Sequence, residues 1–153
     1  MTNYVVNRGI MNKHNLDFSS LRQAIASLAQ ALEITVSDKF EQLDKSWQVT
    51  LIAGVIQNFE FSFELSWKML KRQLEIELPS SAELDSMSYK TLIRTGYERG
   101  LLQSPEQWFD YRMMRNLASH TYNQDKAQQV YSQSKEFLRS ASYLLERLEA
   151  RQS

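Results

Sequence analysis

The chain has 153 residues, of which 42% are hydrophobic and 24% are charged, a balance typical of a globular domain with a real hydrophobic core. It contains no cysteine, which excludes structural disulfides, cysteine-ligated zinc and cysteine nucleophiles. Eighteen basic residues balance eighteen acidic ones, so the chain lacks the positive field of a dedicated nucleic-acid coat protein. No apolar run reaches the length of a membrane span, and we expect a cytoplasmic protein.

Residues 1–16 show no sustained hydrophobic period, and we expect a flexible or partner-docked N-terminal arm ahead of a single domain over 17–150. Met11 offers an alternative start of the chain, with the preceding residues as an upstream extension. His14 lies in this arm, and the lack of any pattern around it favours an ordinary surface residue. Four glycines and two prolines are few, which favours long helices joined by short turns over a many-stranded fold.

Two helical patterns occupy the first half of the domain. The first runs over about 18–35, with Asp17 as a cap for its free amides, and a polar connection over 36–45 follows it. The second and longest helix is predicted over about 47–78. It is apolar on more than one side, which is typical of a central helix or of a helix at an oligomer interface. The apolar positions outside its main stripe are Phe61, Leu65, Met69 and Ile76.

Charged side chains follow one another at a spacing of four in this second helix, at Glu60, Glu64, Lys68 and Arg72. An acid placed four residues before a base stabilises a helix by ~0.2–0.5 kcal/mol per pair. For Lys68 and Arg72 the simplest interpretation is a solvated row of ion pairs. Glu60 and Glu64 stand among phenylalanines, so one of them could instead reach inward and orient a cation.

A short third helix is predicted over 89–99, with Gly100 as its C-terminal stop. Its inward face is expected to hold Leu92, Ile93, Gly96 and Tyr97. The segment 104–107, Ser-Pro-Glu-Gln, has the pattern of a capping box and begins a fourth helix. Trp108 and Phe109 of this helix are expected in the core.

Asn123 can cap a fifth helix over about 124–150. Four long helices and one short one predict an all-α fold, an antiparallel up-and-down four-helix bundle with one extra short helix. The chain shows no internal repeat, no low-complexity tract and no pattern of alternating strands.

The polar stretch 115–122, Arg-Asn-Leu-Ala-Ser-His-Thr-Tyr, lies where the fourth helical pattern runs out and is the best candidate site. On an ideal helix Asn116 and His120 lie ~40° apart, whereas Arg115 and His120 diverge by ~140°. The arginine and the histidine converge if the helix tightens near Ser119 or if the long arginine curls round. They also converge if two copies of the chain face each other.

The residue types in this stretch suit metal-free RNA cleavage. A histidine can take the proton of a ribose 2′-OH near neutral pH, and the planar fork of an arginine matches a phosphate. Arg112, one turn before Asn116, would add positive charge. His120 without an acidic cluster is a poor metal shell, so we expect no metal and no cofactor. Composition and spacing alone favour a structural role, because a charged histidine at a helix end gains ~0.3–1 kcal/mol from the helix dipole.

The stretch 115–122, written as R-N-x-x-x-H-x-Y, resembles the R-x-x-x-x-H-x-Y motif of HEPN domains, which are small helical bundles. The stretch 59–68, written as F-E-x-x-x-E-L-x-W-K, and the downstream Trp108 are similar to one HEPN branch, the nucleotidyltransferase substrate-binding proteins. The resemblance covers about residues 16–150. The two stretches together are fairly specific, whereas the first alone is short.

The resemblance implies a homodimeric bundle that pairs with a separately encoded minimal nucleotidyltransferase. In one interpretation the chain is the toxin half of a toxin–antitoxin pair, a metal-independent endoribonuclease. Arg115 and His120 would be its catalytic pair, with Asn116 beside the arginine. Tyr122 would correspond to a tyrosine that the partner modifies with AMP. The residues expected to support this site are Glu60, Glu64, Arg112 and Ser119.

In the alternative interpretation the chain is a non-catalytic substrate-binding subunit of a two-component nucleotidyltransferase, as the helical domain of aminoglycoside nucleotidyltransferases is. The second apolar face of the helix over 47–78 would then make dimer or partner contacts. Asn123 stands where the family has an acidic cap, and it is still a competent cap. The expected partners are a second copy, the nucleotidyltransferase, and RNA or a nucleotide, with no membrane. A helical scaffold without a site is the remaining option.

Overall fold

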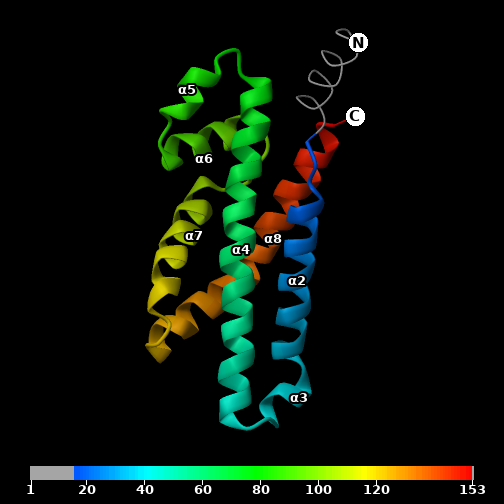
Figure 1. The fold of residues 1–153 in the computed structure, drawn as a ribbon, viewed down its shortest axis with the longest axis vertical. Coiled ribbons are helices and arrows are strands. Elements are labelled where there is room, and N and C mark those ends of the chain that lie inside the picture. The colour runs from blue at the N-terminus through cyan, green and yellow to red at the C-terminus, as the bar shows by residue number, and fades with distance from the viewer. Residues whose placement is uncertain (1–15, 153) are drawn as a thin grey trace, which may run out of the picture.

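The computed structural model describes residues 16–152, and in that part of the chain every regular element is a helix (Figure 1). The long helices are α2 (Ser19–Val36), α4 (Lys45–Glu77), α7 (Pro105–Leu117) and α8 (Gln124–Ala150). The short ones are α3 (Asp38–Glu41), α5 (Ser81–Asp85), α6 (Tyr89–Glu98) and the 3₁₀ turn η1 (Ala118–His120). The predicted bundle is confirmed. The sequence pattern had not predicted α3 or α5, which are too short to show a helical period.

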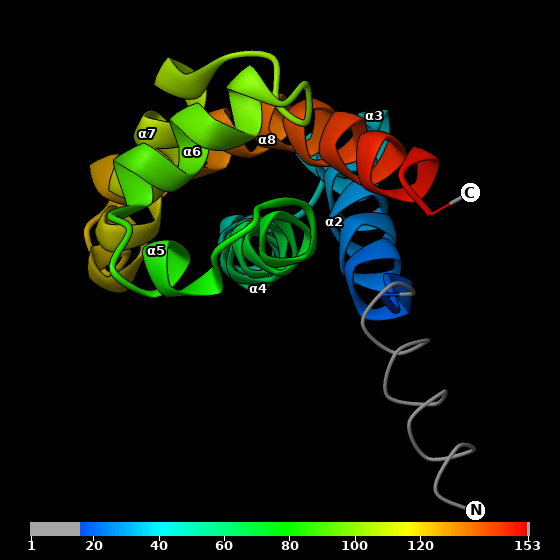
Figure 2. The same ribbon diagram turned by 90° about the horizontal axis from the view of Figure 1, so that it is seen from above.

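The central helix of the bundle is α4, which packs most extensively against α2 and α8. In Figure 1, α2 descends, α4 ascends, α7 descends again, and α8 returns obliquely across the molecule. Seen along α4 in Figure 2, the other helices form an arc around it and leave one side uncovered. Phe61 lies on α4 with 65% of its surface exposed. The apolar character of α4 on more than one side therefore reflects a central helix with an uncovered face.

The predicted cap of α8 is present, whereas at the start of α2 Phe18 is the cap residue and Asp17 acts from one position before it. The Asp17 carboxylate accepts a hydrogen bond from the Ser19 amide at 2.9 Å, just before α2. The Asn123 side chain accepts from the amides of Asp125 and Lys126, at 2.9 and 3.2 Å, at the start of α8. Each bond satisfies an amide that has no partner within the helix.

The predicted capping box at the start of α7 is half correct. The Ser104 hydroxyl accepts from the Gln107 amide at 3.4 Å. The Gln107 side chain does not return to the cap but contacts Glu136 and Ser140 of α8, both at 3.4 Å. Gly100 ends the preceding helix with φ at 79°, a left-handed conformation that favours glycine.

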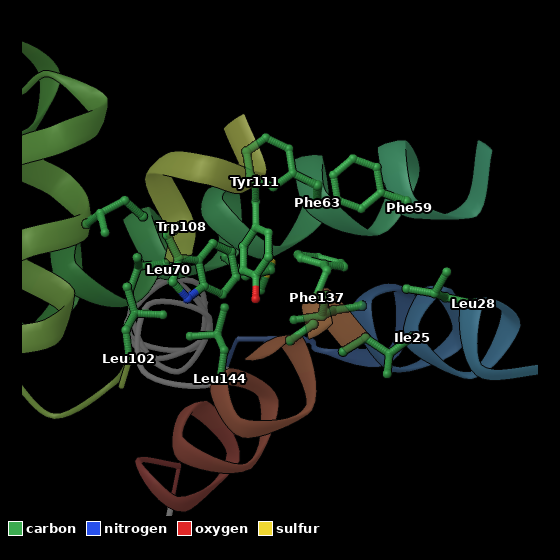
Figure 3. Packing of buried hydrophobic residues seen from close by; sticks show 14 of the residues in the cluster. Ile25, Leu28, Phe59, Phe63, Leu70, Leu102, Trp108, Tyr111, Phe137 and Leu144 are labelled. Atoms are coloured by element: carbon green, nitrogen blue, oxygen red, sulfur yellow. The ribbon is translucent and has the colours of Figure 1, made fainter. Parts of the chain in front are cut away.

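The core beneath the candidate site is aromatic (Figure 3). Phe137 of α8 meets four rings edge-on, those of Phe59 at 5.1 Å, Tyr111 at 5.1 Å, Trp108 at 5.8 Å and Phe63 at 6.2 Å between centroids. Phe63 stacks on Trp108 at 6.4 Å. Such pairs contribute ~0.5–1.5 kcal/mol each beyond their buried area, so they hold α4, α7 and α8 in a fixed relation.

Two predictions for individual side chains were wrong. Tyr97 was expected inward on α6 but is 50% exposed. Its neighbour Gly96 takes the inward position, where a Cβ would approach the Leu70 side chain to 3.0 Å. Phe109 was expected in the core but is only partly buried. It lies on the flank of α7, because Trp108 occupies the position that faces the core.

The predicted N-terminal arm over 1–16 lies outside the described residues apart from Leu16. The amide of Leu16 donates to the Gln152 side chain at 3.2 Å, next to the end of α8. Among residues 16–152, no helix combines the length and the apolar character that a membrane crossing requires.

Candidate functional site

The end of α7 tightens from an α-helix into the 3₁₀ turn η1, which begins at Ala118 and ends at His120. A tightening near Ser119 was one of the conditions under which Arg115 and His120 could converge. In a 3₁₀ turn each residue rotates ~120° about the helix axis, compared with ~100° in an α-helix. With three such rotations before His120, the directions of Arg115 and His120 around the axis differ by ~160°. The tightening therefore does not bring Arg115 and His120 of one chain together.

Arg115 lies between α7 and α4, where two carboxylates hold it. Its Nη1 is 3.1 Å from Glu60 Oε2, and its Nε is 3.5 Å from Glu64 Oε1. The Nε atom is shielded from solvent and makes no hydrogen bond, so the contact with Glu64 is ionic only. The Arg115 side chain as a whole remains 33% exposed. Both acids thus orient the guanidinium and leave part of it accessible to a ligand.

Glu64 also connects Arg115 to its neighbours on α4. Its Oε2 accepts a hydrogen bond from Trp67 Nε1 at 3.2 Å and lies 3.9 Å from Lys68 Nζ. The second contact is the predicted ion pair at a spacing of four. The first was not predicted, because spacing along a helix does not show which acid an indole will reach. Glu64 therefore fixes an aromatic ring and a cation at the same time.

His120 and Tyr122 lie on the exposed end of the stretch. The His120 Nδ1 is 3.5 Å from the Tyr122 hydroxyl, and the two rings meet edge-on with centroids 5.9 Å apart. Tyr122 is 81% exposed. The Ser119 hydroxyl donates to the Asn116 carbonyl at 2.8 Å, which ties the turn to the preceding helix. These residues are accessible to a macromolecular substrate.

A cleft of about 400 Å³ opens beside Arg115, between α4, α6 and α7. We call it the Tyr89 cleft. Its charged, polar and aromatic lining comprises Phe63, Glu64, Trp67, Lys71, Tyr89, Arg112, Arg115 and Asn116. His120 does not line it. The structure therefore places Arg112, Arg115 and Asn116 in one cleft and leaves His120 and Tyr122 outside it.

Tyr89 of α6 and Arg112 of α7 contact each other in the lining of the cleft. The Arg112 guanidinium lies 4.7 Å from the centre of the Tyr89 ring, and the Tyr89 hydroxyl donates to the Trp108 carbonyl at 2.8 Å. Burial raises the pKa of Tyr89 well above its ordinary value and outweighs the opposing effect of Arg112. The phenol therefore stays neutral at physiological pH. Sequence reasoning missed Tyr89 and Lys71, because the only signal for either was a position at a helix start or on a polar flank.

No cluster of three or more histidine, cysteine or acidic side chains suited to a metal ion occurs among residues 16–152. Glu60 and Glu64 of α4 both contact Arg115. Their negative charge therefore serves to orient a cation of the protein itself.

Comparison with known proteins connects this geometry to a family. Residues 16–150 match the family described as "Nucleotidyltransferase substrate binding protein like". A curated relative is the "Probable ribonuclease HepT" of Haemophilus influenzae strain Rd. It is 41% identical over 143 residues, which is 92% of this chain and 97% of that protein.

Two solved structures share the fold. One is HI0074 from Haemophilus influenzae, whose structure is described as revealing the fold of a substrate binding domain of a nucleotidyltransferase. It has a TM-score of 0.84 and 40% sequence identity, and the match covers 87% of this chain and 99% of HI0074. Protein ttk003001694 from Thermus thermophilus has a TM-score of 0.62 and 27% identity over 82% of this chain and 98% of its own. The resemblance inferred from the two sequence stretches is confirmed. The chain belongs to the nucleotidyltransferase substrate binding protein like family.

Proposed function

We propose that this protein is a metal-independent endoribonuclease, the toxin half of a toxin–antitoxin pair whose other member is a minimal nucleotidyltransferase. The observation that carries the proposal is the setting of Arg115, which Glu60 and Glu64 orient at a cationic cleft beside the helix end that presents His120. The similarity to the protein named probable ribonuclease HepT supports it. Because its substrate would be RNA, we expect the protein to act in the cytoplasm.

The chemistry assigns one step to each side chain. His120 takes the proton of a ribose 2′-OH, and the oxygen attacks the adjacent phosphorus. The bond from phosphorus to the 5′ oxygen of the next nucleotide breaks, and the leaving oxygen takes up a proton. Arg115 binds the non-bridging oxygens, where negative charge develops. The products are a 2′,3′-cyclic phosphate and a 5′-hydroxyl, and no step needs a metal ion.

The test uses purified protein, single-stranded RNA and excess EDTA. The wild type should cut the RNA and yield cyclic phosphate ends that mass spectrometry identifies. His120→Ala should slow cleavage by about 10²–10⁴-fold, the contribution of a positioned general base. Arg139→Ala is the matched surface control, because the Arg139 side chain is 79% exposed on α8. An inactive wild type, or a His120→Ala variant that cuts at the wild-type rate, overturns the proposal.

A second copy of the chain completes this site in the proposal. Arg115 and His120 point ~160° apart around the axis of one chain, so each needs its counterpart from a neighbour. The uncovered face of α4 lies next to Arg115 and carries an open groove that Phe61 and Leu65 help to line. Burying the exposed Phe61 ring would stabilise a dimer through this face. We place the second copy there.

Mixing two inactive variants tests the shared site. Arg115→Ala and His120→Ala are each expected to be inactive alone. A mixed dimer of the two contains one site with both residues intact, so co-expression should restore cleavage. Phe61→Glu should give a monomer by light scattering and abolish this rescue. Mixed dimers without activity would show that Arg115 and His120 do not meet across the interface.

Tyr122 is the proposed point of control by the nucleotidyltransferase. Its hydroxyl is exposed and close to His120, so AMP attached there would place a phosphate against the catalytic histidine. In the transfer, the phenol oxygen bonds to the α-phosphorus of ATP, pyrophosphate leaves, and the phenol proton goes to solvent. Incubation with the partner and ATP should add the mass of AMP, and Tyr122→Phe should abolish it. Labelling that persists in Tyr122→Phe would move the modification elsewhere.

The alternative is a non-catalytic subunit that presents substrate to a nucleotidyltransferase. The Tyr89 cleft and the description of the Haemophilus influenzae structure favour it. In that case the two proteins should co-purify, and transfer by the nucleotidyltransferase should depend on Arg112 but not on His120. If both proteins are stably expressed together but form no complex, this alternative is contradicted.

A further inference from the structure

The outer corner between α6 and α7 gathers positive charge at one aromatic ring. Lys90 and Arg94 stand one turn apart on α6, and both are exposed. The Lys90 Nζ lies 5.7 Å and the Arg94 guanidinium carbon 5.5 Å from the centre of the Phe109 ring on α7. Because each cation is attracted to the ring, Phe109 keeps two like charges together beside the start of α7.

No acid of the described chain neutralises this pair of cations. Among residues 16–152, neither Lys90 nor Arg94 has a carboxylate within 4.0 Å. Arg99, Arg115 and Arg151, in contrast, each contact a glutamate. The formal net charge of the chain is zero, so the pair is a local excess of positive charge and not part of a general field. Two cations held together without a counter-ion attract an anionic partner.

The exposed side of α7 leads from this pair toward His120. Met113 follows Phe109 by one turn, ~40° around the axis. Its side chain is 62% exposed. His120 lies ~80° from Phe109 around the axis and ~18 Å further along it, after eight α-helical and three 3₁₀ steps. Phe109, Met113 and His120 therefore lie on one side of α7, which descends from α6 toward η1 (Figure 1).

A ligand that uses this whole side of the molecule is elongated, carries repeated negative charge and has apolar surface. A small anion would reach the two cations but not the exposed Met113. A single strand of RNA carries one phosphate per nucleotide and presents the flat faces of unpaired bases to aromatic and apolar side chains. An acidic polypeptide carries repeated charge but lacks such planar groups. The combination of cations, Phe109 and Met113 therefore favours RNA.

We propose that the outer side of α6 and α7 binds single-stranded RNA, with phosphates at Lys90 and Arg94 and bases against Phe109 and Met113. We call these four residues the Phe109 surface. It is separate from the Tyr89 cleft, whose lining includes none of them. The course of the strand onward to His120 rests on the proposed function, whereas binding at the Phe109 surface does not. The surface lengthens the contact with RNA by a few nucleotides on one side of the cut.

The first experiment measures the binding of an uncleavable RNA, a single strand of 2′-O-methyl nucleotides, by fluorescence anisotropy at a series of salt concentrations. Each phosphate contact adds about 0.7 to the slope of log K against log salt for a single strand. Lys90→Ala/Arg94→Ala should therefore lower this slope by about 1.4 and weaken binding about tenfold. A structural role for the two cations would not move the slope.

The matched control is Lys39→Ala/Arg139→Ala, which removes the same charge from exposed positions on α3 and α8. It should bind the strand with the wild-type affinity and the wild-type slope. Phe109→Leu separates the ring from the charge, because it keeps both cations and the apolar volume. It should weaken binding about two- to fivefold at an unchanged slope. The urea midpoint of this variant is measured as well, because Phe109 packs against the core.

Cleavage adds a test of RNA length. A long strand reaches both the Phe109 surface and His120, whereas a dinucleotide reaches only the site of cutting. With long RNA, Lys90→Ala/Arg94→Ala should raise KM about tenfold and leave kcat unchanged. With the dinucleotide, the wild type and the variant should cleave equally.

Several results would overturn the assignment of the Phe109 surface. One is a wild type that does not bind the strand, and another is a Lys90→Ala/Arg94→Ala variant that binds it with the wild-type affinity and slope. An equal loss in Lys39→Ala/Arg139→Ala would reduce the effect to net charge. Poly-glutamate that binds as tightly as RNA, with the same loss in Lys90→Ala/Arg94→Ala, would assign the surface to an acidic protein segment instead.

The failure of this inference can be distinguished from failure of the proposed function. A wild type that cuts no RNA but binds the uncleavable strand through Lys90 and Arg94 removes the ribonuclease and leaves the Phe109 surface standing. A wild type and a Lys90→Ala/Arg94→Ala variant that bind and cut long RNA equally well do the reverse.

Discussion

Two clusters combine arginine and glutamate in opposite proportions. One has two arginines around a single glutamate, and the other has two glutamates around a single arginine. In the Glu77 cluster, Arg99 and Arg151 surround one carboxylate, with Arg151 Nη1 at 2.6 and 2.7 Å from its oxygens and Arg99 Nε at 2.9 Å. In the Arg115 cluster, Glu60 and Glu64 surround one guanidinium at 3.1 and 3.5 Å.

The difference lies in how completely each central group is satisfied. The Glu77 side chain is 13% exposed, and Arg151 also donates to the Arg99 carbonyl, so the cluster joins the end of α4 to the ends of α6 and α8. The Arg115 side chain is 33% exposed, and its Nε makes no hydrogen bond. The first cluster joins three helix ends, whereas the second leaves its guanidinium partly exposed. Four predictions test this contrast.

The largest effect is expected from Arg115→Lys. Lysine keeps the charge but lacks the planar fork that binds two phosphate oxygens. We expect RNA cleavage to fall about 10²-fold, the typical loss of one group that stabilises the transition state. The free energy of unfolding in urea should stay within about 0.5 kcal/mol of the wild type. A fall of several kcal/mol would mean that Arg115 serves the fold as the Glu77 cluster does.

Glu77→Gln should have the opposite profile. The change removes the charge that Arg99 and Arg151 share, and hydrogen bonds to charged groups contribute ~1.5–3 kcal/mol. We expect urea denaturation to show a loss of about 2 kcal/mol. Cleavage per folded molecule should be unchanged, because the cluster lies away from Arg115. Reduced cleavage at full folding would show that the two clusters are coupled.

Glu64→Gln is the matched substitution in the Arg115 cluster. The amide can still accept from Trp67 but no longer attracts Arg115 electrostatically. Pairs this exposed contribute ~0–1 kcal/mol to stability, so unfolding should change little. We expect cleavage to fall about tenfold, equivalent to ~1.4 kcal/mol in the barrier, because the guanidinium is less well oriented. The cleavage rate at saturating RNA should fall, whereas the midpoint of urea denaturation should stay at its wild-type value.

The smallest effect is expected in the pH dependence of stability. Burial alone would raise the pKa of Glu77, but hydrogen bonds from Gln73, Arg99 and Arg151 outweigh it and hold this pKa below 4.5. Since the folded pKa is the lower one, its contribution to stability is present above pH 4.5 and is lost as the pH falls through the folded pKa. The wild type should therefore lose stability below pH 4.5 more steeply than Glu77→Gln. Parallel urea-denaturation curves for the two proteins over this range would contradict the assigned cause.

The helices and their caps could be predicted because they depend on neighbours in the chain. Asn123 reaches amides two and three residues away, and Ser104 reaches one three residues away. The Gln107 side chain could not be predicted, because α8 offers it partners that compete with its own cap. The prediction that Tyr97 faces inward was wrong because the pattern of a ten-residue helix leaves its inward face ambiguous. Gly96 faces inward instead, since the Leu70 side chain lies close to it.

The candidate site was predictable in part. The polar stretch at the end of α7 stood out because polar groups at an apolar helix end are costly to bury without a role. The sequence left open whether Glu60 or Glu64 would face a cation, and the fold places both beside Arg115. Tyr89 and Lys71 lie on other helices and have no spacing that links them to Arg115. Only the packing of α4, α6 and α7 brings them into one cleft.

The sequence by itself determined the all-helical class, the order of the long helices and the family, because periodicity and short motifs are local properties. The tertiary structure decided that Arg115 faces two acids and that His120 lies outside the cleft that Arg115 lines. It also decided that an aromatic and cationic cleft lies between α4, α6 and α7. The physical reason is that an ion pair or a cleft wall depends on which helices pack together. Periodicity specifies which face of a helix is buried but not which helix will cover it.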